Sequence, residues 1–102
     1  MRWIILKDLV PIEDCPSDEL KGKIPKNLQN ESDKAKREWA ETLPFEFRLF
    51  DDDGELYYEG RCGDLEEADD YYAFAPLDWA MNSAGCTRMD YRKVGEQEWK
   101  TL

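Results

Sequence analysis

Alternation between apolar and polar residues predicts a β-hairpin in the middle of the chain. Residues 45–50 place three apolar side chains on one face of a strand and two charged ones on the other, the pattern of a half-buried strand. A strand-like run resumes at residues 56–58. The four residues 51–54 between the two runs are expected to form the hairpin loop, with Gly54 at a positive φ.

Two other parts of the chain also predict strands. Residues 3–6 form a short, continuous apolar run that is typical of a buried strand. Near the end of the chain, residues 87–92 alternate again, Gly95 marks a turn, and Trp99 and Thr101 share one face of a last strand. A second hairpin is therefore expected to close the chain.

Apolar residues at helical spacing predict two helices. The first is expected to have Asn30 or Ser32 as its N-cap and to end before Pro44, because proline cannot continue a helix. The second is expected to begin near Pro76 and to end just before Gly85. The apolar stripes of the first and second helix are, respectively, Ala35, Trp39, Ala40 and Leu43, and Leu77, Ala80, Met81 and Ala84.

The remaining segments are expected to be irregular. Residues 7–30 contain scattered prolines and charges without a sustained period, which predicts a long connection. Gly60, Gly63 and the acidic residues 64–70 are expected to interrupt the strand pattern with a loop or one exposed helical turn. The whole order predicts a single α+β domain over residues 1–102: a small, mostly antiparallel sheet, made from the N-terminal strand and two hairpins, with two helices packed on one face.

Length and composition restrict the class of protein further. A chain of 102 residues and 12.0 kDa with 41% hydrophobic residues is large enough for one real core. It contains no histidine, which removes the commonest general base and the usual imidazole zinc sites. The cysteines Cys15, Cys62 and Cys86 are widely spaced and odd in number, so neither a disulfide framework nor a zinc knuckle is indicated. Together with the absence of a signal peptide or a long apolar segment, this favours the cytoplasm.

The negative charge is concentrated in one fifth of the chain. The formal net charge is −10, and residues 51–70 contribute ten acidic residues against the single base Arg61. This imbalance disfavours direct binding to nucleic acid or to an anionic membrane and favours a basic protein partner, provided that the carboxylates form one hydrated face. Solvation alone is the alternative, since charge runs usually face water. The acidic residues are Asp51, Asp52, Asp53, Glu55, Glu59, Asp64, Glu66, Glu67, Asp69 and Asp70.

Catalytic and metal chemistry are not indicated. The sequence of residues 51–55 lacks the EF-hand spacing of calcium ligands, which predicts a tight turn in which Asp side chains bond the loop backbone. Adjacent hydrated carboxylates are poor acid–base pairs, because that chemistry needs one carboxyl group in a desolvated cleft. Cys62 has no histidine to serve as its base. We therefore expect no enzymatic activity, no catalytic residue, no metal site and no cofactor.

Aromatic residues next to the acidic stretch extend the candidate surface. Tyr57, Tyr58, Tyr71 and Tyr72 flank it, and alternation lets only one of the first two point into the core. Exposed rings among carboxylates suit an arginine-rich partner through charge-assisted hydrogen bonds and cation–π contacts. Trp79 lies off the stripe of its helix and is the tryptophan expected at an interface. The alternative is that these rings only cover the sheet.

At the level of class, a small, acidic, histidine-free α+β domain with a clustered negative patch resembles the anti-CRISPR proteins and other DNA-mimic inhibitors of phages and mobile elements. The resemblance implies a stoichiometric inhibitor that occupies the nucleic-acid channel or another working surface of a basic complex, such as a CRISPR effector. The alternative function is a cytosolic scaffold or interaction domain that binds through an apolar face containing Trp79 or Met81.

Overall fold

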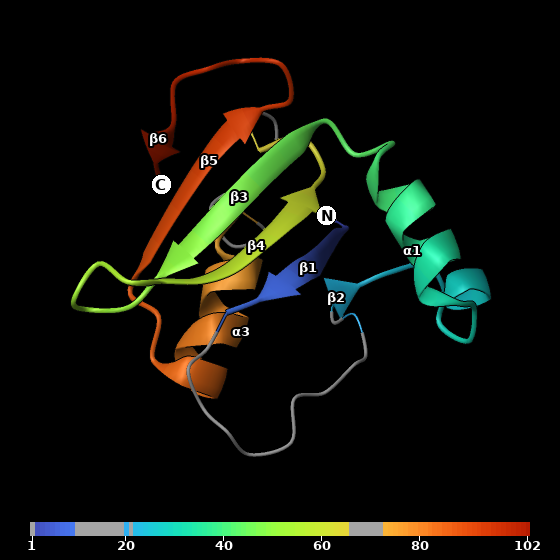
Figure 1. Cartoon of the computed structure of the whole chain (residues 1–102), viewed down its shortest axis with the longest axis horizontal. Coiled ribbons are helices and arrows are strands. Elements are labelled where there is room, and N and C mark those ends of the chain that lie inside the picture. Colours follow the sequence, from blue (N-terminus) through green and yellow to red (C-terminus); the bar gives the residue numbers. More distant parts are fainter. Residues whose placement is uncertain (1, 10–19, 21, 66–72) are drawn as a thin grey trace.

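The computed structural model describes residues 2–9, 20, 22–65 and 73–102 and contains one antiparallel sheet of six strands with two α-helices, which confirms the α+β class (Figure 1). The strand order is β2-β1-β4-β3-β5-β6. The strands are β1 (Trp3–Asp8), β2 (Gly22–Lys23), β3 (Phe45–Phe50), β4 (Leu56–Cys62), β5 (Arg88–Lys93) and β6 (Lys100–Thr101). The helices are the 3-10 turn η1 (Lys26–Leu28), α1 (Asp33–Ala40) and α3 (Ala75–Ala84).

The β3–β4 hairpin forms the centre of the sheet. Its pairing runs from Phe45 opposite Cys62 to Phe50 opposite Leu56, and Gly54 in the loop has a φ of +80°, as predicted. The expected interruption at Gly60 is wrong, because β4 continues through this residue. A Cβ atom at Gly60 would lie 2.1 Å from the carbonyl oxygen of Ile4, so glycine is needed here for the close approach of β1 and not for a turn.

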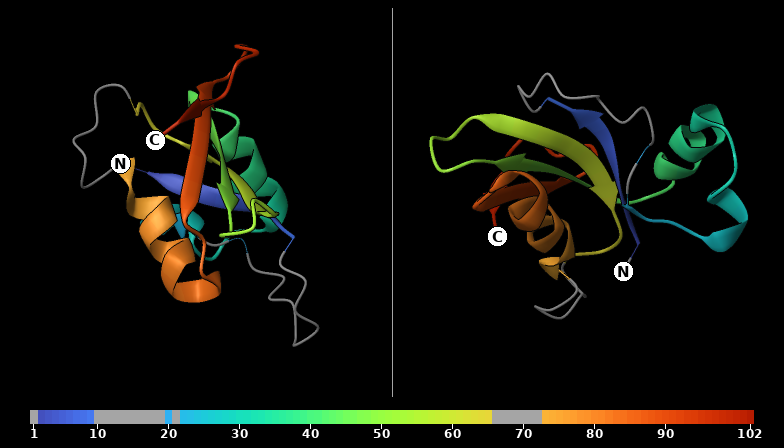
Figure 2. Two further views of the ribbon diagram at one scale, coloured as in Figure 1. Left: turned by 90° about the vertical axis from the view of Figure 1, so that its left-hand side faces the viewer. Right: turned by 90° about the horizontal axis from the view of Figure 1, so that it is seen from below.

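One face of the sheet packs against α3, which lies beneath it in the right-hand view of Figure 2. Alternate residues of four strands point to this face, and α3 contributes Leu77 and Ala80 to the same core. Gly85 ends the helix at a φ of +74°, as predicted. Leu77 and Ala80 of the predicted apolar stripe face the sheet, whereas Met81 is 50% exposed and does not belong to the buried face of the helix. The buried residues of this core are Trp3, Ile5, Phe45, Phe47, Leu49, Tyr58, Cys62, Leu65, Ala73, Leu77, Ala80, Cys86 and Met89.

Helix α1 packs on the other face of the sheet, at its β1 edge. Ser32 is its N-cap, as predicted, and accepts a hydrogen bond from the backbone N–H of Ala35 at 3.3 Å. The C-terminal residue of the helix, Ala40, is fully buried in a second cluster with Ile4 and Ile24. Because Ile4 alternates with its neighbours on β1, this cluster lies opposite the α3 core. The two helices therefore cover opposite faces, unlike the predicted arrangement on one face; the apolar run of β1 is buried on both sides.

The long connection expected over residues 7–30 is partly regular. β1 extends to Asp8, and residues 22–23 pair with β1 as an outer strand before η1 begins. Residues 10–19 and 21 lie outside the described part. Among the helices that the structure describes, none has the length and apolar character needed to cross a lipid bilayer.

Candidate functional site

The β3–β4 loop is organised by one carboxylate. Asp51 accepts hydrogen bonds from the backbone N–H groups of Asp53 at 3.0 Å and Glu55 at 2.8 Å, as expected for a tight Asx-type turn. The Glu55 hydrogen bond is the largest of the contacts that lower the pKa of Asp51, and the hydroxyl group of Tyr57 donates another. The same bond raises the pKa of Tyr57. Asp51 is therefore the internal acceptor of the loop and not an outward-facing ligand.

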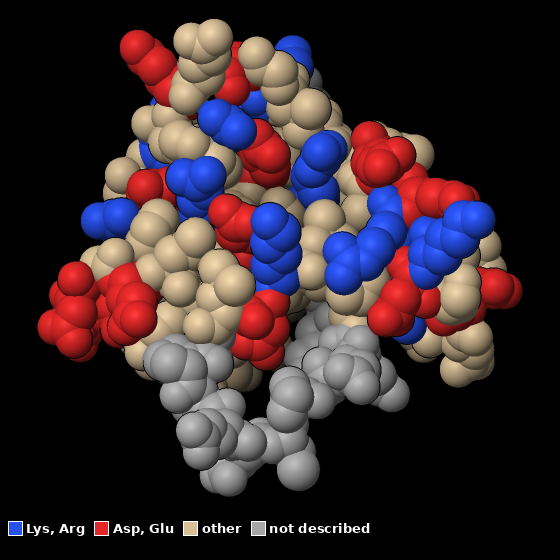
Figure 3. Space-filling view, in the orientation of Figure 1, with Lys and Arg blue, Asp and Glu red and all other residues tan. Residues whose placement is uncertain are grey.

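Three carboxylates of this loop point to solvent. Asp52, Asp53 and Glu55 are exposed, and within the described part of the chain none of them forms an ion pair. Figure 3 shows acidic side chains gathered at the β3–β4 loop, at the left edge of the molecule. Because Asp51 fixes the backbone from inside, these three groups project from an ordered turn. They are the part of the predicted acidic surface that the structure brings together.

The other described acidic residues of segment 51–70 lie elsewhere. Glu59 is on the sheet face opposite α3, where its carboxylate is 3.5 Å from the Nζ of Lys7 and 3.2 Å from the Nε of Arg48. Asp64 follows the far end of β4, and a seven-residue strand spans about 20 Å. The expectation of one contiguous hydrated face is therefore wrong for the described members. The remaining candidates lie outside the described residues: Glu66, Glu67, Asp69, Asp70, Tyr71 and Tyr72.

The aromatic candidates divide between surface and core. Tyr58 is only 4% exposed, because its register opposite Leu49 points it toward α3, and burial raises the pKa of its hydroxyl group to about 12. Trp79 is half-buried beside it. The ring centroid of Trp79 lies 5.0 Å from that of Tyr58 and 5.9 Å from that of Trp3. Tyr57 stays partly exposed at the loop. Tyr58 is thus corrected to a core residue, and Trp79 has a packing role that the sequence did not indicate.

The sheet face opposite α3 carries an arrangement that the sequence analysis did not find. The guanidinium groups of Arg48 and Arg92 both contact the indole of Trp99, at 4.2 and 4.3 Å from its ring centroid. Each arginine is also paired with a carboxylate, Arg48 with Glu59 and Arg92 with Glu46. In Figure 3 the two signs of charge interleave over this part of the sheet. Each of these two arginines is thus neutralised locally, and with Lys7 and Arg61 beside them the cations of this face outnumber the carboxylates Glu46 and Glu59.

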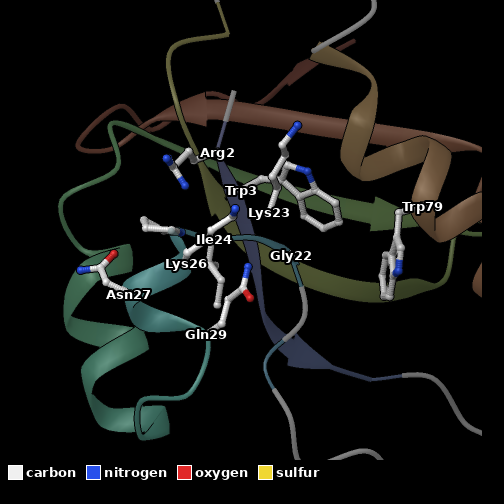
Figure 4. Close-up of a pocket in the computed structure, with 10 residues that line it drawn as sticks. Arg2, Trp3, Gly22, Lys23, Ile24, Lys26, Asn27, Gln29 and Trp79 are labelled. Atoms are coloured by element: carbon white, nitrogen blue, oxygen red, sulfur yellow. The ribbon is translucent and has the colours of Figure 1, made fainter.

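A groove of about 1020 Å³ lies between the start of β1, the segment from β2 to η1, and α3 (Figure 4). Trp3 and Trp79 contribute indole rings to it. Three cations, Arg2, Lys23 and Lys26, line it as well, and the described lining contains no Asp or Glu. No sequence pattern indicated this groove, because its cations come from three separate positions: the residue before β1, β2 and η1.

The two described cysteines are buried in the α3 core. Burial raises the pKa of the Cys62 thiol to about 12, and burial followed by the charge of Asp51 raises that of Cys86 to about 11. Neither thiol is a ready nucleophile at neutral pH. Among the residues that the structure describes, no group of three Cys, Asp or Glu side chains is arranged to hold a metal ion. Comparisons with known proteins found no family model that matches the chain and no curated protein or solved structure with significant similarity to it.

Proposed function

We propose that this chain is a non-enzymatic, anti-CRISPR-like inhibitor that acts in the cytoplasm by binding a basic nucleic-acid-binding protein or complex, such as a CRISPR effector. The contact surface is the tip of the β3–β4 loop. The observation that supports the proposal is the set of three outward carboxylates, Asp52, Asp53 and Glu55, on a turn that Asp51 holds in place.

The physical basis is electrostatic and depends on the order of the loop. Two carboxylates about 7 Å apart repel each other by about 0.6 kcal/mol in water before screening by salt. Lysine or arginine side chains of a partner relieve this repulsion and form charge-assisted hydrogen bonds. Because the turn is already ordered, binding costs little conformational entropy. A basic surface occupied in this way is no longer accessible to the phosphates of a nucleic acid.

A pull-down from the native host, read by mass spectrometry at low and high salt, tests the proposal. The loop variant carries Asp52→Lys, Asp53→Lys and Glu55→Lys. The matched control makes the same change in charge at three exposed acids in and on either side of α1, with Glu31→Lys, Glu38→Lys and Glu41→Lys.

The wild type and the control variant are expected to recover a basic nucleic-acid-binding protein that added salt or free nucleic acid displaces. The loop variant is expected to recover none of it. Recovery that is indifferent to salt, or that is equal for the two variants, contradicts the proposal.

The alternative function, a scaffold domain that binds through an apolar face, is favoured by one observation. Met81 is 50% exposed on the outer side of α3. A partner that docks there is expected to be lost from the pull-down with Met81→Lys and retained with the three loop substitutions. The two proposals therefore predict opposite results for the same set of variants.

A further inference from the structure

The groove at the start of β1 has a composition unlike that of the acidic molecule around it. Its described lining combines the three cations Arg2, Lys23 and Lys26 with two indole rings. All three cations are exposed and form no ion pair within the described residues, unlike the paired arginines of the sheet face opposite α3. Exposed, unpaired cations around an apolar wall attract a ligand that is both anionic and aromatic.

We propose that this groove binds nucleotide phosphates, with the phosphate at the cations and the base against the half-buried indole of Trp79, which the largely buried Trp3 supports from the core side. In Figure 4 the three cations and Trp79 lie on different sides of Trp3, so charge and indole flank one groove. Positive grooves with aromatic side chains are how proteins hold single-stranded nucleic acid, because every base has a face that can stack. The ligand is either a free nucleotide or one unit of a single strand. This site is separate from the β3–β4 loop.

Polar groups on the rim favour a base over a simple carboxylate. Asn27 and Gln29 line the same groove and are exposed. Their amide groups both donate and accept hydrogen bonds, which suits the mixed edge of a nucleobase. An acidic peptide needs the cations but not an aromatic ring beside them. A volume of about 1020 Å³ is at the upper end of the range for small-molecule sites and also admits a short strand.

Among the described acids of segment 51–70, the carboxylates of the β3–β4 loop lie far from this groove, whereas Asp64 follows β4 at the groove end, next to Gly63, whose backbone N–H bonds the carbonyl oxygen of Arg2. Trp3, in the groove, pairs with Cys62 at the end of β4, whereas the acidic loop precedes the start of β4. The length of β4 separates the two regions by about 20 Å. This separation exceeds the Debye length of about 8 Å at physiological salt, so the field of the loop carboxylates is largely screened at the groove.

Binding is tested by titrating the full chain with four probes while the indole N–H signals are followed by NMR. The probes are inorganic phosphate, thymidine 5′-monophosphate, an oligothymidylate of about 8 nucleotides and a glutamate-rich peptide of similar length. The signals of Trp3 and Trp79 are expected to shift with the two nucleotide probes. Three phosphate contacts predict a slope of about −2 for the logarithm of the strand's association constant against that of the salt concentration.

Substitution of single lysines distinguishes binding in the groove from a general electrostatic attraction of the ligand to the protein. Lys23→Gln and Lys26→Gln are each expected to weaken strand binding by up to about fivefold, the most that one exposed ion pair contributes. Each is also expected to reduce the steepness of the salt slope by about 0.7. The control Lys93→Gln removes an exposed lysine of β5 outside the groove and is expected to change neither quantity.

The outcomes distinguish the possible ligands. Stronger binding of the strand than of the monophosphate supports a single-stranded nucleic acid, and equal binding of the two supports a free nucleotide. No saturable shift at Trp3 and Trp79, tighter binding of the acidic peptide than of either nucleotide probe, or an equal effect of Lys93→Gln overturns the proposal. The loop variant with three lysines is expected to keep nucleotide binding, so this proposal and the proposed function fail independently.

Discussion

Gly60 sits at the most crowded point of the sheet, and its replacement by alanine gives the sharpest test of the fold. A Cβ atom at this position would lie 2.1 Å from the carbonyl oxygen of Ile4 and 2.6 Å from the Cζ of Phe47. Neither neighbour can give way easily. Ile4 belongs to the paired strand β1, and Phe47 is 1% exposed in the core. Gly60→Ala therefore has to push β1 away from β4 or displace a buried ring.

The cost follows from the distance that has to be gained. Ordinary van der Waals contact begins at 3.4 Å, so the carbonyl oxygen must retreat from 2.1 Å to that distance while its strand remains hydrogen-bonded on both sides. Overpacking a core costs about 1–3 kcal/mol, and a clash with backbone belongs at or above the upper end of that range. A loss of at least about 3 kcal/mol is a large part of the 5–15 kcal/mol that stabilises an ordinary domain.

Urea unfolding followed by circular dichroism measures this loss. With a slope of roughly 1.5 kcal/mol/M, about 3 kcal/mol lowers the midpoint by about 2 M, and thermal unfolding is expected about 15 °C lower. The control is Gly95→Ala, where a Cβ atom meets nothing within 4 Å and only the φ of +98° is unfavourable, at a cost of about 1 kcal/mol. If Gly60→Ala is no less stable than Gly95→Ala, the steric argument is refuted.

Trp99→Leu removes the ring that two guanidinium groups contact and is expected to lower the free energy of unfolding by about 1–2 kcal/mol. Hydrogen exchange in the variant is expected to be faster in β6 than in α3. An unchanged thermal unfolding temperature would contradict this prediction. In a Cys15→Ser variant, Cys62 and Cys86 are expected to be unreactive toward a thiol reagent at about pH 8 until denaturant is added, because burial raises the pKa of both thiols. Labelling of the native protein would show the burial argument to be wrong. The lowered pKa of Asp51 contributes stability that is present above pH 3.8 and is lost as the pH falls through the folded-state pKa. Asp51→Asn is therefore expected to flatten the stability profile as the pH falls below 3.8, whereas profiles parallel to that of the wild type would exclude this role.

Local patterns were sufficient to predict most of the elements. The alternation of residues 45–50 and the Asp-rich turn with Gly54 identify the central hairpin, because strand period and turn chemistry are both local properties. Ser32 and Gly85 mark helix ends for the same reason. The faces that the helices cover were not predictable. A continuous apolar run such as that of β1 shows burial on both sides without showing which helix packs on which side.

The candidate site was harder to predict because charge counted along the sequence is not charge arranged in space. Glu59 belongs to the acidic stretch, yet strand register brings it to Lys7 and Arg48 from two neighbouring strands. Conversely, the groove cations Lys23 and Lys26 lie in a segment that was expected to be an irregular connection. In both cases the surroundings of the charged side chain depend on contacts between residues far apart in the sequence, which no local pattern indicates.

The two outermost strands, β2 and β6, are each only two residues long, and each carries a lysine, Lys23 or Lys100. A short, positively charged rim offers few free backbone donors and acceptors for recruiting an additional strand from another molecule. Each rim pairs with only two residues of the longer strand beside it, Trp3 and Ile4 of β1 or Asp90 and Tyr91 of β5. Over these stretches the rims discourage fibrillar aggregation, and a variant that lengthened either rim with β-branched residues would lose that protection.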